Sequence, residues 1–289
     1  MSGKLSAIIK TIVTAVLFYL LFRKVDFQQF AAILQNARFD ILLPSLAVLW
    51  LGHYICIYRW RMLMRPLMPV FSLARLFGIY CIGLFFNLAF PTAVGGDVVK
   101  MYYAGKPSRM YAESFAATFL DRDSGMLAMM IIACAGILIH PVEIPGLPVA
   151  VIVWLTLALF VFANAVIFMP SLHYPLSRLL RRIGLARIAS KVDAISNAFQ
   201  VMGRHPAPLL GSLLISTVNQ LLVITFVWIL GAGLRLDIPF VYYLVFIPVT
   251  TLISMIPISL NGMGLREYAF LSLFGAIGVA PESCIALGL

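Results

Sequence analysis

The sequence predicts an all-α polytopic membrane protein, and its composition and hydrophobic pattern carry that prediction. Of its 289 residues, 62% are hydrophobic and 11% are charged, whereas soluble domains have about 45–50% apolar and about 25% charged residues. The mean hydropathy is +1.02. Apolar runs cover residues 5–22, 41–57, 76–90, 112–139, 147–169, 209–230, 238–258 and 268–289. Because a spanning helix needs about 20 apolar residues, these runs predict about 6–8 hydrophobic segments, of which one or two are re-entrant or broken helices.

We expect one integral membrane domain over residues 1–289, with an internal repeat that suggests halves 1–146 and 147–289. The first run carries Lys10 and lacks a small-residue cleavage pattern, so it is interpreted as a retained span and not a signal peptide. The last run reaches residue 289 without a polar tail, which leaves open whether the chain is truncated there.

The distribution of Lys and Arg predicts on which side of the membrane each loop lies. Two basic segments are expected in the cytoplasm, and the loop 140–146, which has no Lys or Arg, is expected outside. The first segment contains Arg59, Arg61, Arg65 and Arg75, and the second contains Arg178, Arg181, Arg182, Arg187, Lys191 and Arg204. Since residues 112–139 end at the outer loop, Lys100, Lys106 and Arg109 must also be cytoplasmic.

This parity makes residues 76–90 enter and leave on one face, as a re-entrant hairpin that is too short to span comfortably. Residues 238–258 are long enough to cross, so they either span the membrane or form a second hairpin. A second hairpin would enter from outside, and the two halves would then be inverted repeats.

Two copies of the pattern P-x4-G-x3-[K/R] interrupt apolar runs, one from Pro91 to Lys100 and one from Pro257 to Arg266. Matched interruptions in the two halves of a membrane protein point to a binding site near the midplane. Each motif either opens a helix whose free N–H groups bind a phosphate beside the cation, or forms only tight turns and close helix contacts. The glycines concerned are Gly95, Gly96, Gly262 and Gly264. A P-loop or dinucleotide site is excluded, because neither cluster follows a strand or has the required spacing.

Residues 176–203 carry apolar side chains at helical spacing, with basic residues on the opposite face. The pattern predicts a cytoplasmic amphipathic helix. Its cations either contact anionic headgroups, at about 1 kcal/mol per charge, or simply follow the positive-inside rule. The net charge of +10 fits both interpretations. A nucleic-acid partner is not expected, because the basic residues do not form a soluble domain.

Three charged residues, Asp121, Arg122 and Asp123, lie inside the apolar run 112–139. Asp121 precedes Ile139 by roughly 27 Å of helix, which places these charges near the cytoplasmic edge of the bilayer core. Adjacent helical residues point about 100° apart, so Asp121 does not neutralise Arg122. The partner of Arg122 is expected to be Asp97 or a ligand anion, and the alternative role is an interhelical ion pair that fixes the bundle. Asp123 is expected at a solvated position.

The cysteines and histidines show no spacing typical of metal ligands or of a catalytic triad. No metal, no cofactor and no catalytic residue is predicted.

Three sets of residues together resemble the integral-membrane, flippase-like family named after the transmembrane domain of bacterial lysylphosphatidylglycerol synthase. The first runs from Phe86 and Asn87 through Pro91 to Gly95, Gly96, Asp97 and Lys100; the second is Asp121, Arg122 and Gly125; the third is Pro257 to Gly264 with Arg266 and Glu267. The resemblance covers nearly the whole chain. Lys100 stands where this family more often has Arg, which keeps the charge and loses bidentate phosphate geometry.

The motifs assign a set of site residues. The expected substrate-binding residues are Asn87, Gly96, Asp97, Lys100, Asp121, Arg122, Asn261, Gly262, Arg266 and Glu267, and the expected structural residues are Pro91, Gly95, Gly125, Pro257 and Gly264.

The resemblance implies a lipid flippase or transporter that moves an anionic or modified lipid across the bacterial inner membrane. The alternative is a membrane-embedded enzyme or accessory subunit in lipid-linked glycan or isoprenoid lipid metabolism, with Asp97, Asp121 and Glu267 as the acids placed to serve. The resemblance favours transport over lipid synthesis, because the soluble aminoacyl-transferase domain of the bifunctional synthases in this family has no counterpart here. Anionic lipid headgroups are the expected partners, and a homo-oligomer or a lipid-modifying partner enzyme is left open.

Overall fold

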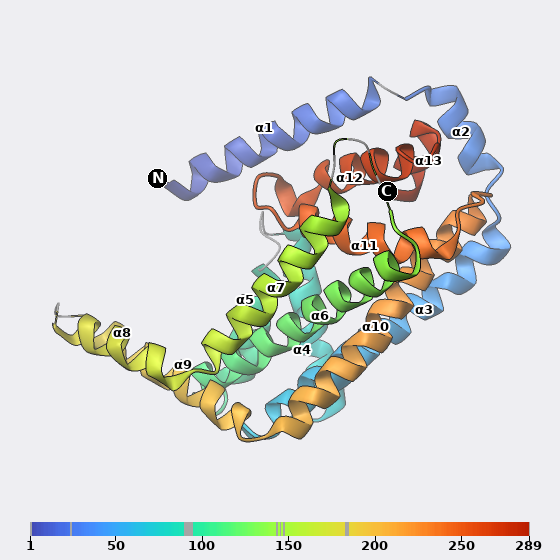
Figure 1. Ribbon diagram of the computed structural model, residues 1–289. Helices are drawn as coiled ribbons and strands as arrows, with labels where there is room; N and C mark the ends of the chain where they lie inside the picture. Colours follow the sequence, from blue (N-terminus) through green and yellow to red (C-terminus); the bar gives the residue numbers. More distant parts are fainter. Residues whose placement is uncertain are drawn as a thin grey trace.

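The computed structural model describes residues 2–23, 25–89, 95–142, 144, 146, 148–182 and 185–288, and it is a helical bundle of the polytopic membrane type (Figure 1). The helices are α1 (Ser2–Phe22), α2 (Phe27–Gln35), α3 (Phe39–Met64), α4 (Leu73–Ala89), α5 (Gly95–Gly105), α6 (Tyr111–Ile139), α7 (Val149–Ile167), α8 (Pro170–Arg182), α9 (Ala186–Gly203), α10 (Pro206–Gly233), α11 (Phe240–Ser254), the 3-10 turn η1 (Leu260–Gly262), α12 (Leu265–Gly275) and α13 (Pro281–Gly288).

Four helices of the described chain, α3, α6, α7 and α10, are long and apolar enough to cross a membrane. Their outward surfaces are apolar: Leu155 of α7 is 68% exposed and Leu214 of α10 is 69% exposed. Such surfaces require a bilayer as their solvent. The protein is therefore embedded in a membrane, as its composition predicts.

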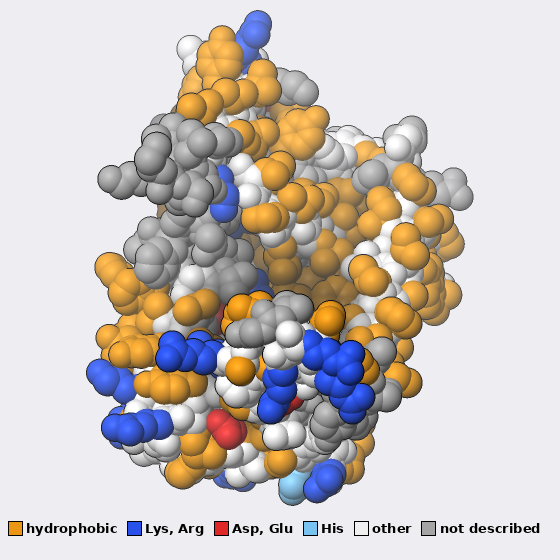
Figure 2. Space-filling model, turned by 90° about the vertical axis from the view of Figure 1, so that its left-hand side faces the viewer, with side chains coloured by type: hydrophobic (Ala, Val, Ile, Leu, Met, Phe, Trp, Pro, Cys, Tyr) orange, Lys and Arg blue, Asp and Glu red, His pale blue; other side chains and the backbone are white. Residues whose placement is uncertain are grey.

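Two apolar clusters mark the two ends of this bundle. At one end, Met64 and Leu67 pack with Met110 and Met202. These residues are close in sequence to basic residues, namely Arg65, Arg109 and Arg204. At the other end, Val142 and Ile238 form a cluster with Val149. We call these the basic end and the far end. In Figure 2 most of the visible Lys and Arg side chains lie in the lower part of the view, and hydrophobic side chains cover much of the upper part, with a few cations among them.

The four long helices alternate in direction between the two ends. The helix α6 runs from Leu120 in the basic-end cluster to Ile137 in the far-end cluster, and α7 returns from Val149. The helix α3 begins at the far end, where the Arg38 backbone N–H donates to the Gly233 carbonyl at the end of α10. The parts of the chain that contain Arg65, Lys106, Arg109 and Arg204, all predicted on one side of the membrane, thus lie at one end of the structure, whereas the side chains of Arg59 and Lys100 are buried inside the bundle.

The helices α4 and α5 form an antiparallel hairpin that starts and ends at the basic end. Leu76 near the start of α4 is buried in the basic-end cluster, and Gly105 at the end of α5 lies against Met110 and Tyr111. Near the tip, Gly96 of α5 lies so close to Gly83 of α4 that a Cβ on Gly96 would meet the Gly83 carbonyl oxygen. The sequence predicted a hairpin within residues 76–90, and that prediction is wrong in its bounds: Leu73–Ala89 form one helix, and the chain returns to the basic end through α5. Residues 90–94, which include Pro91, lie outside the described residues.

The helices α11 and α12 form a second hairpin, which starts and ends at the far end. Tyr242 near the start of α11 lies 5.4 Å from His140 (ring centroids), and Tyr243 lies 5.2 Å from Phe274 near the end of α12. The sequence left open whether residues 238–258 cross the membrane or form a hairpin. In the structure α11 ends at Ser254, and the chain then reverses through a turn that contains Pro257. The two hairpins therefore approach from opposite ends of α6. The division into halves 1–146 and 147–289 stays a prediction.

Three expectations about single segments need correction. The run 268–289 is not one helix, because the chain turns at Gly278 (φ 90°) and α13 begins at Pro281. The predicted amphipathic helix 176–203 consists of two helices, α8 and α9. The short helix α2 was not expected; Asp26 caps it by accepting from the Gln28 backbone N–H at 2.8 Å.

Arg59 also lies elsewhere than predicted. The sequence placed it in a cytoplasmic loop, but α3 continues to Met64 and buries the Arg59 side chain inside the bundle. The helix tolerates this cation because a carboxylate on α6 lies against it.

Candidate functional site

A cavity of about 350 Å³ lies between the two hairpins and the long helices. It is lined by Cys56, Arg59, Tyr80, Gly83, Leu84, Asn87, Asp97, Lys100, Asp121, Arg122, Gly125, Met126, Met129, Asn219, Gln220, Val223, Thr251 and Met255. These residues come from α3, α4, α5, α6, α10 and α11. We call this space the central cavity.

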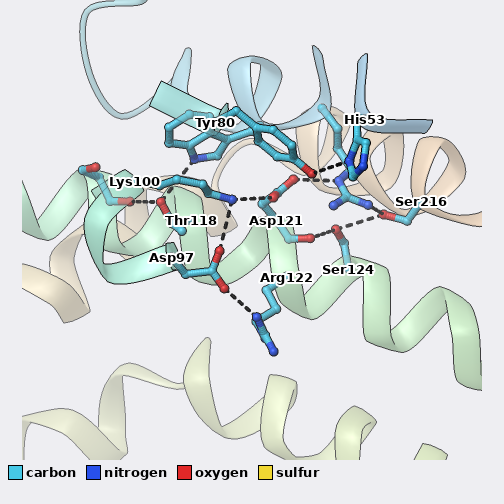
Figure 3. A network of polar contacts seen from close by, with 12 residues as sticks. His53, Tyr80, Asp97, Lys100, Thr118, Asp121, Arg122, Ser124 and Ser216 are labelled. Atoms are coloured by element: carbon cyan, nitrogen blue, oxygen red, sulfur yellow. Dashed lines mark hydrogen bonds and ion pairs between the residues drawn. The ribbon is translucent and has the colours of Figure 1, made fainter. Parts of the chain in front are cut away.

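Five charged side chains line the central cavity in a row of alternating sign (Figure 3). Arg122 Nη1 lies 2.6 Å from Asp97 Oδ2, and Asp97 Oδ1 lies 3.1 Å from Lys100 Nζ. Lys100 Nζ lies 3.9 Å from Asp121 Oδ2, and Asp121 Oδ1 lies 2.7 Å from Arg59 Nε. Three cations face two carboxylates, so the row carries a net charge of +1 when all five groups are ionised.

Helix geometry explains why this row forms. Asp97 and Lys100 are three residues apart on α5 and share one face. Asp121 and Arg122 are adjacent on α6 and point about 100° apart, so Asp121 meets α3 while Arg122 meets α5. The predicted pairing of Arg122 with Asp97 is confirmed.

Serine hydroxyls hold the buried end of the row. Arg59 Nη1 donates to Ser216 Oγ of α10 at 2.6 Å, and Ser216 in turn donates to Ser124 Oγ at 3.1 Å. Gln220 donates to the Gly125 carbonyl at 3.1 Å. The ion pair between α3 and α6 is thereby joined to α10, and three of the long helices are linked through polar groups.

Lys100 is buried against aromatic rings. Its Nζ lies 5.0 Å from the Tyr80 ring centroid and 5.2 Å from that of Trp60, which are cation–π distances. Its stem crosses α4 so closely that a Cβ on Gly83 would lie 2.6 Å from Lys100 Cγ. Glycine at position 83 is therefore required for the lysine to reach the two carboxylates.

The first glycine motif does not present a free N–H group at Gly96. Asn87 Oδ1 accepts from the Gly96 backbone N–H at 2.8 Å, so α4 caps the start of α5. Asn87 still lines the central cavity, as do Asp97 and Lys100. Gly95 begins α5, and Pro91 lies outside the described residues.

The second motif forms a tight turn away from the central cavity. Asn261, Gly262 and Gly264 have φ values of 48°, 76° and 82°. The Gly264 N–H donates to Glu267 Oε2 at 2.7 Å, and Arg266 Nη2 lies 3.2 Å from Glu267 Oε1. None of these residues lines the central cavity. Of the two interpretations of this motif, phosphate binding or a tight turn, the geometry matches the tight turn. Substrate binding by these residues stays a prediction.

This hairpin reaches the cavity through α11. Thr251 and Met255, at the end of that helix, line the central cavity opposite the first hairpin. Residues close to each hairpin tip, Asn87 on one and Met255 on the other, therefore share one space.

Sequence reasoning missed several cavity residues. Arg59, Tyr80, Ser216, Asn219, Gln220 and Thr251 were not expected at the site. The adjacent polar pair Asn219 and Gln220 inside the apolar run 209–230 was a usable signal, because polar groups within a span usually face a cavity or a partner. Asp123 was expected in solvent, but its Oδ1 accepts from Asn164 of α7 at 3.1 Å.

The fold and the site define a polytopic helical membrane protein in which two opposed hairpins flank a charged cavity. The family described as lysylphosphatidylglycerol synthase TM region matches residues 7–289, so the chain belongs to that family. The resemblance found in the sequence motifs is confirmed. No curated protein and no solved structure matches the chain. No group of three His, Cys, Asp or Glu side chains suited to a metal ion lies within the described residues.

Proposed function

We propose that the protein is a lipid transporter that carries the phosphate-bearing headgroup of an anionic or modified lipid through the central cavity. The observation that supports this most strongly is the row of three cations and two carboxylates beside the tips of two opposed hairpins. Its net positive charge suits an anionic headgroup. We further propose that the protein crosses the bacterial inner membrane several times, with the headgroup inside the protein and the acyl chains in lipid.

Arg122 is the group best suited to take the phosphate. Its side chain is 30% exposed, whereas that of Lys100 is 8% exposed. A guanidinium binds phosphate oxygens through two parallel N–H donors. When a phosphate replaces Asp97 on Arg122, Asp97 keeps Lys100 as its partner at 3.1 Å. Phosphate binding therefore replaces one anion on Arg122 with another, and it leaves no buried carboxylate without a cation.

The cavity volume fits this role. At about 350 Å³ it lies at the small end of the range of about 300–1,000 Å³ for ligand pockets. Such a space accommodates a headgroup but not two acyl chains. The exposed apolar surfaces of the neighbouring helices leave those chains in the bilayer.

The enzyme alternative receives less support from the same geometry. A general acid or base must be free to contact the reacting group of a substrate. Asp97 and Asp121 each contact two cations, and Glu267 contacts Arg266 and the Gly264 N–H. These contacts favour structural and electrostatic roles for all three acids.

Reconstitution tests the proposal. Proteoliposomes with a panel of fluorescent phospholipids, with and without an anionic or modified headgroup, should show protein-dependent movement between leaflets. Arg122→Gln should lower this rate by about tenfold or more, equivalent to about 1.4 kcal/mol, with little change in thermal stability. Lys106→Gln, which removes one exposed cation from the same end, serves as the matched control. Transport by Arg122→Gln at the wild-type rate, or no movement of any lipid by the wild type, would contradict the proposal.

A further inference from the structure

A second cavity with cationic side chains lies at the basic end, between the α5–α6 turn and α9. Its volume is about 580 Å³. Its polar lining includes Arg109, Glu113 and Lys191, and its apolar lining includes Met101, Phe115 and Ile195. We call it the basic groove. It brings together Arg109 and Lys191, which are 82 positions apart in the chain.

The charge of the basic groove is not balanced within it. Two cations face one carboxylate, and among the described residues neither Arg109 nor Lys191 has an ion-pair partner. Arg181 on α8, by contrast, is paired with Asp193 of α9 at 2.6 Å. The groove thus presents a net positive charge beside apolar side chains, a combination suited to an anionic headgroup with its attached hydrocarbon.

A third cavity, of about 90 Å³, lies between α5 and α6 and has lining residues in common with both the groove and the central cavity. It shares Met101 and Phe115 with the basic groove, and it shares Asp97 and Arg122 with the central cavity. Thr118 and Phe119 of α6 also line this third cavity. Each cavity thus shares side chains with the next one, from the basic end to the charged row.

We infer that the basic groove is a loading site, where the phosphate of a lipid headgroup binds before it passes between α5 and α6 to Arg122. This inference rests on the proposed function. The groove lies among the segments predicted at the cytoplasmic surface, and amphipathic α9 forms one of its walls. Met101, Phe115 and Phe119 separate two cationic sites with an apolar constriction, which the headgroup enters only when these side chains move. The occupant is a lipid and not a free anion, because apolar side chains make up much of the groove wall.

Transport kinetics provide the first test. The double variant Arg109→Gln/Lys191→Gln should raise the lipid mole fraction needed for half-maximal rate by about fivefold or more per cation, equivalent to about 1 kcal/mol each. The maximal rate should stay close to that of the wild type, because Arg122 is intact. The matched control is Lys106→Gln/Arg187→Gln, which removes two charges from the same turn and the same helix outside the groove lining. Equal half-maximal fractions in the two double variants would overturn the inference.

A binding test does not depend on transport. In a cysteine-free background, Ala194→Cys places a thiol in the groove, and Ala186→Cys places one elsewhere on α9. In phosphatidylcholine nanodiscs, added phosphatidylglycerol should slow maleimide labelling at position 194 and not at 186, and Arg109→Gln/Lys191→Gln should remove this protection. Inorganic phosphate or glycerol phosphate alone should not protect.

The possible results separate the two proposals. Protection of position 194 without any lipid movement would support the headgroup site and contradict the transport function. If lipid moves but position 194 is labelled equally fast with and without phosphatidylglycerol, the transport function would be supported and the loading site would be overturned. Protection by free phosphate as strong as that by phosphatidylglycerol would show that the groove binds anions in general, and it would also overturn the lipid assignment.

Discussion

Arg59 Nε donates to Asp121 Oδ1 at 2.7 Å, although the two residues are 62 positions apart and each side chain is only 6% exposed. The bond joins α3 to α6 inside the bundle. It also sets one end of the charged row, because Asp121 Oδ2 lies 3.9 Å from Lys100 Nζ. Stability and the electrostatics of the central cavity are thus coupled through one ion pair.

Breaking this pair should destabilise the protein. Arg59→Met leaves Asp121 buried without its main partner and should cost about 3–5 kcal/mol in the free energy of unfolding. Adding Asp121→Asn should recover a large part of that loss, because it removes the unpaired charge. Thermal unfolding in detergent measures both effects. The control, Arg65→Met at an exposed position, should change stability by less than about 0.5 kcal/mol. Strictly additive losses in the double variant would refute this account.

The arrangement of the hairpins predicts the accessibility of introduced cysteines. In a cysteine-free protein in intact cells, Arg65→Cys and Lys106→Cys should both resist an impermeant reagent added outside, because they flank the first hairpin at the basic end. His140→Cys, at the far end, should react. Labelling of only one of the first two would show that residues 76–90 cross the membrane.

The contact between Gly83 and Gly96 should be intolerant of any side chain. In Gly96→Ala the new Cβ would meet the Gly83 carbonyl oxygen and Asn87, which should cost about 1–3 kcal/mol. Gly78→Ala on α4 is the control. A Cβ there has no neighbour within 4 Å, so helix propensity should make it neutral or stabilising by about 0.5–1 kcal/mol. The difference in melting temperature between the two variants measures the close approach, and equal values would exclude it.

Glu267 should stabilise the second hairpin without contacting the substrate. Glu267→Ala leaves the buried Gly264 N–H without its acceptor, and that should cost about 1–3 kcal/mol. Arg266→Ala should cost less than about 1 kcal/mol, since its side chain is 49% exposed. Both variants are compared by thermal unfolding and lipid transport. Loss of transport in a fully stable Arg266→Ala would instead return Arg266 to the binding site, as its motif predicts.

Local chemistry determined much of this protein from the sequence alone. Residues 112–139 match α6 to within one residue, because a long apolar run has few alternatives in a bilayer. The sides assigned to the basic segments predicted that the chain turns back near residues 76–90, because a run of about 15 apolar residues is too short to cross comfortably. Because an intramembrane cation needs an anion, the sequence predicted either Asp97 or a ligand anion as the partner of Arg122, and the structure contains the pair with Asp97.

Only the tertiary structure decided which helices face one another. Arg59 was assigned to a loop because positive charge near the end of a span usually marks the cytoplasmic side, and nothing local reveals that Asp121 lies opposite it. Likewise, the repeat predicted that Gly262 and Arg266 approach the cavity, whereas the packing of α11 on α6 brings Thr251 and Met255 there. Periodicity and composition fix how a segment meets lipid, but ion pairs and cavities between distant helices depend on contacts that form only when the whole bundle assembles.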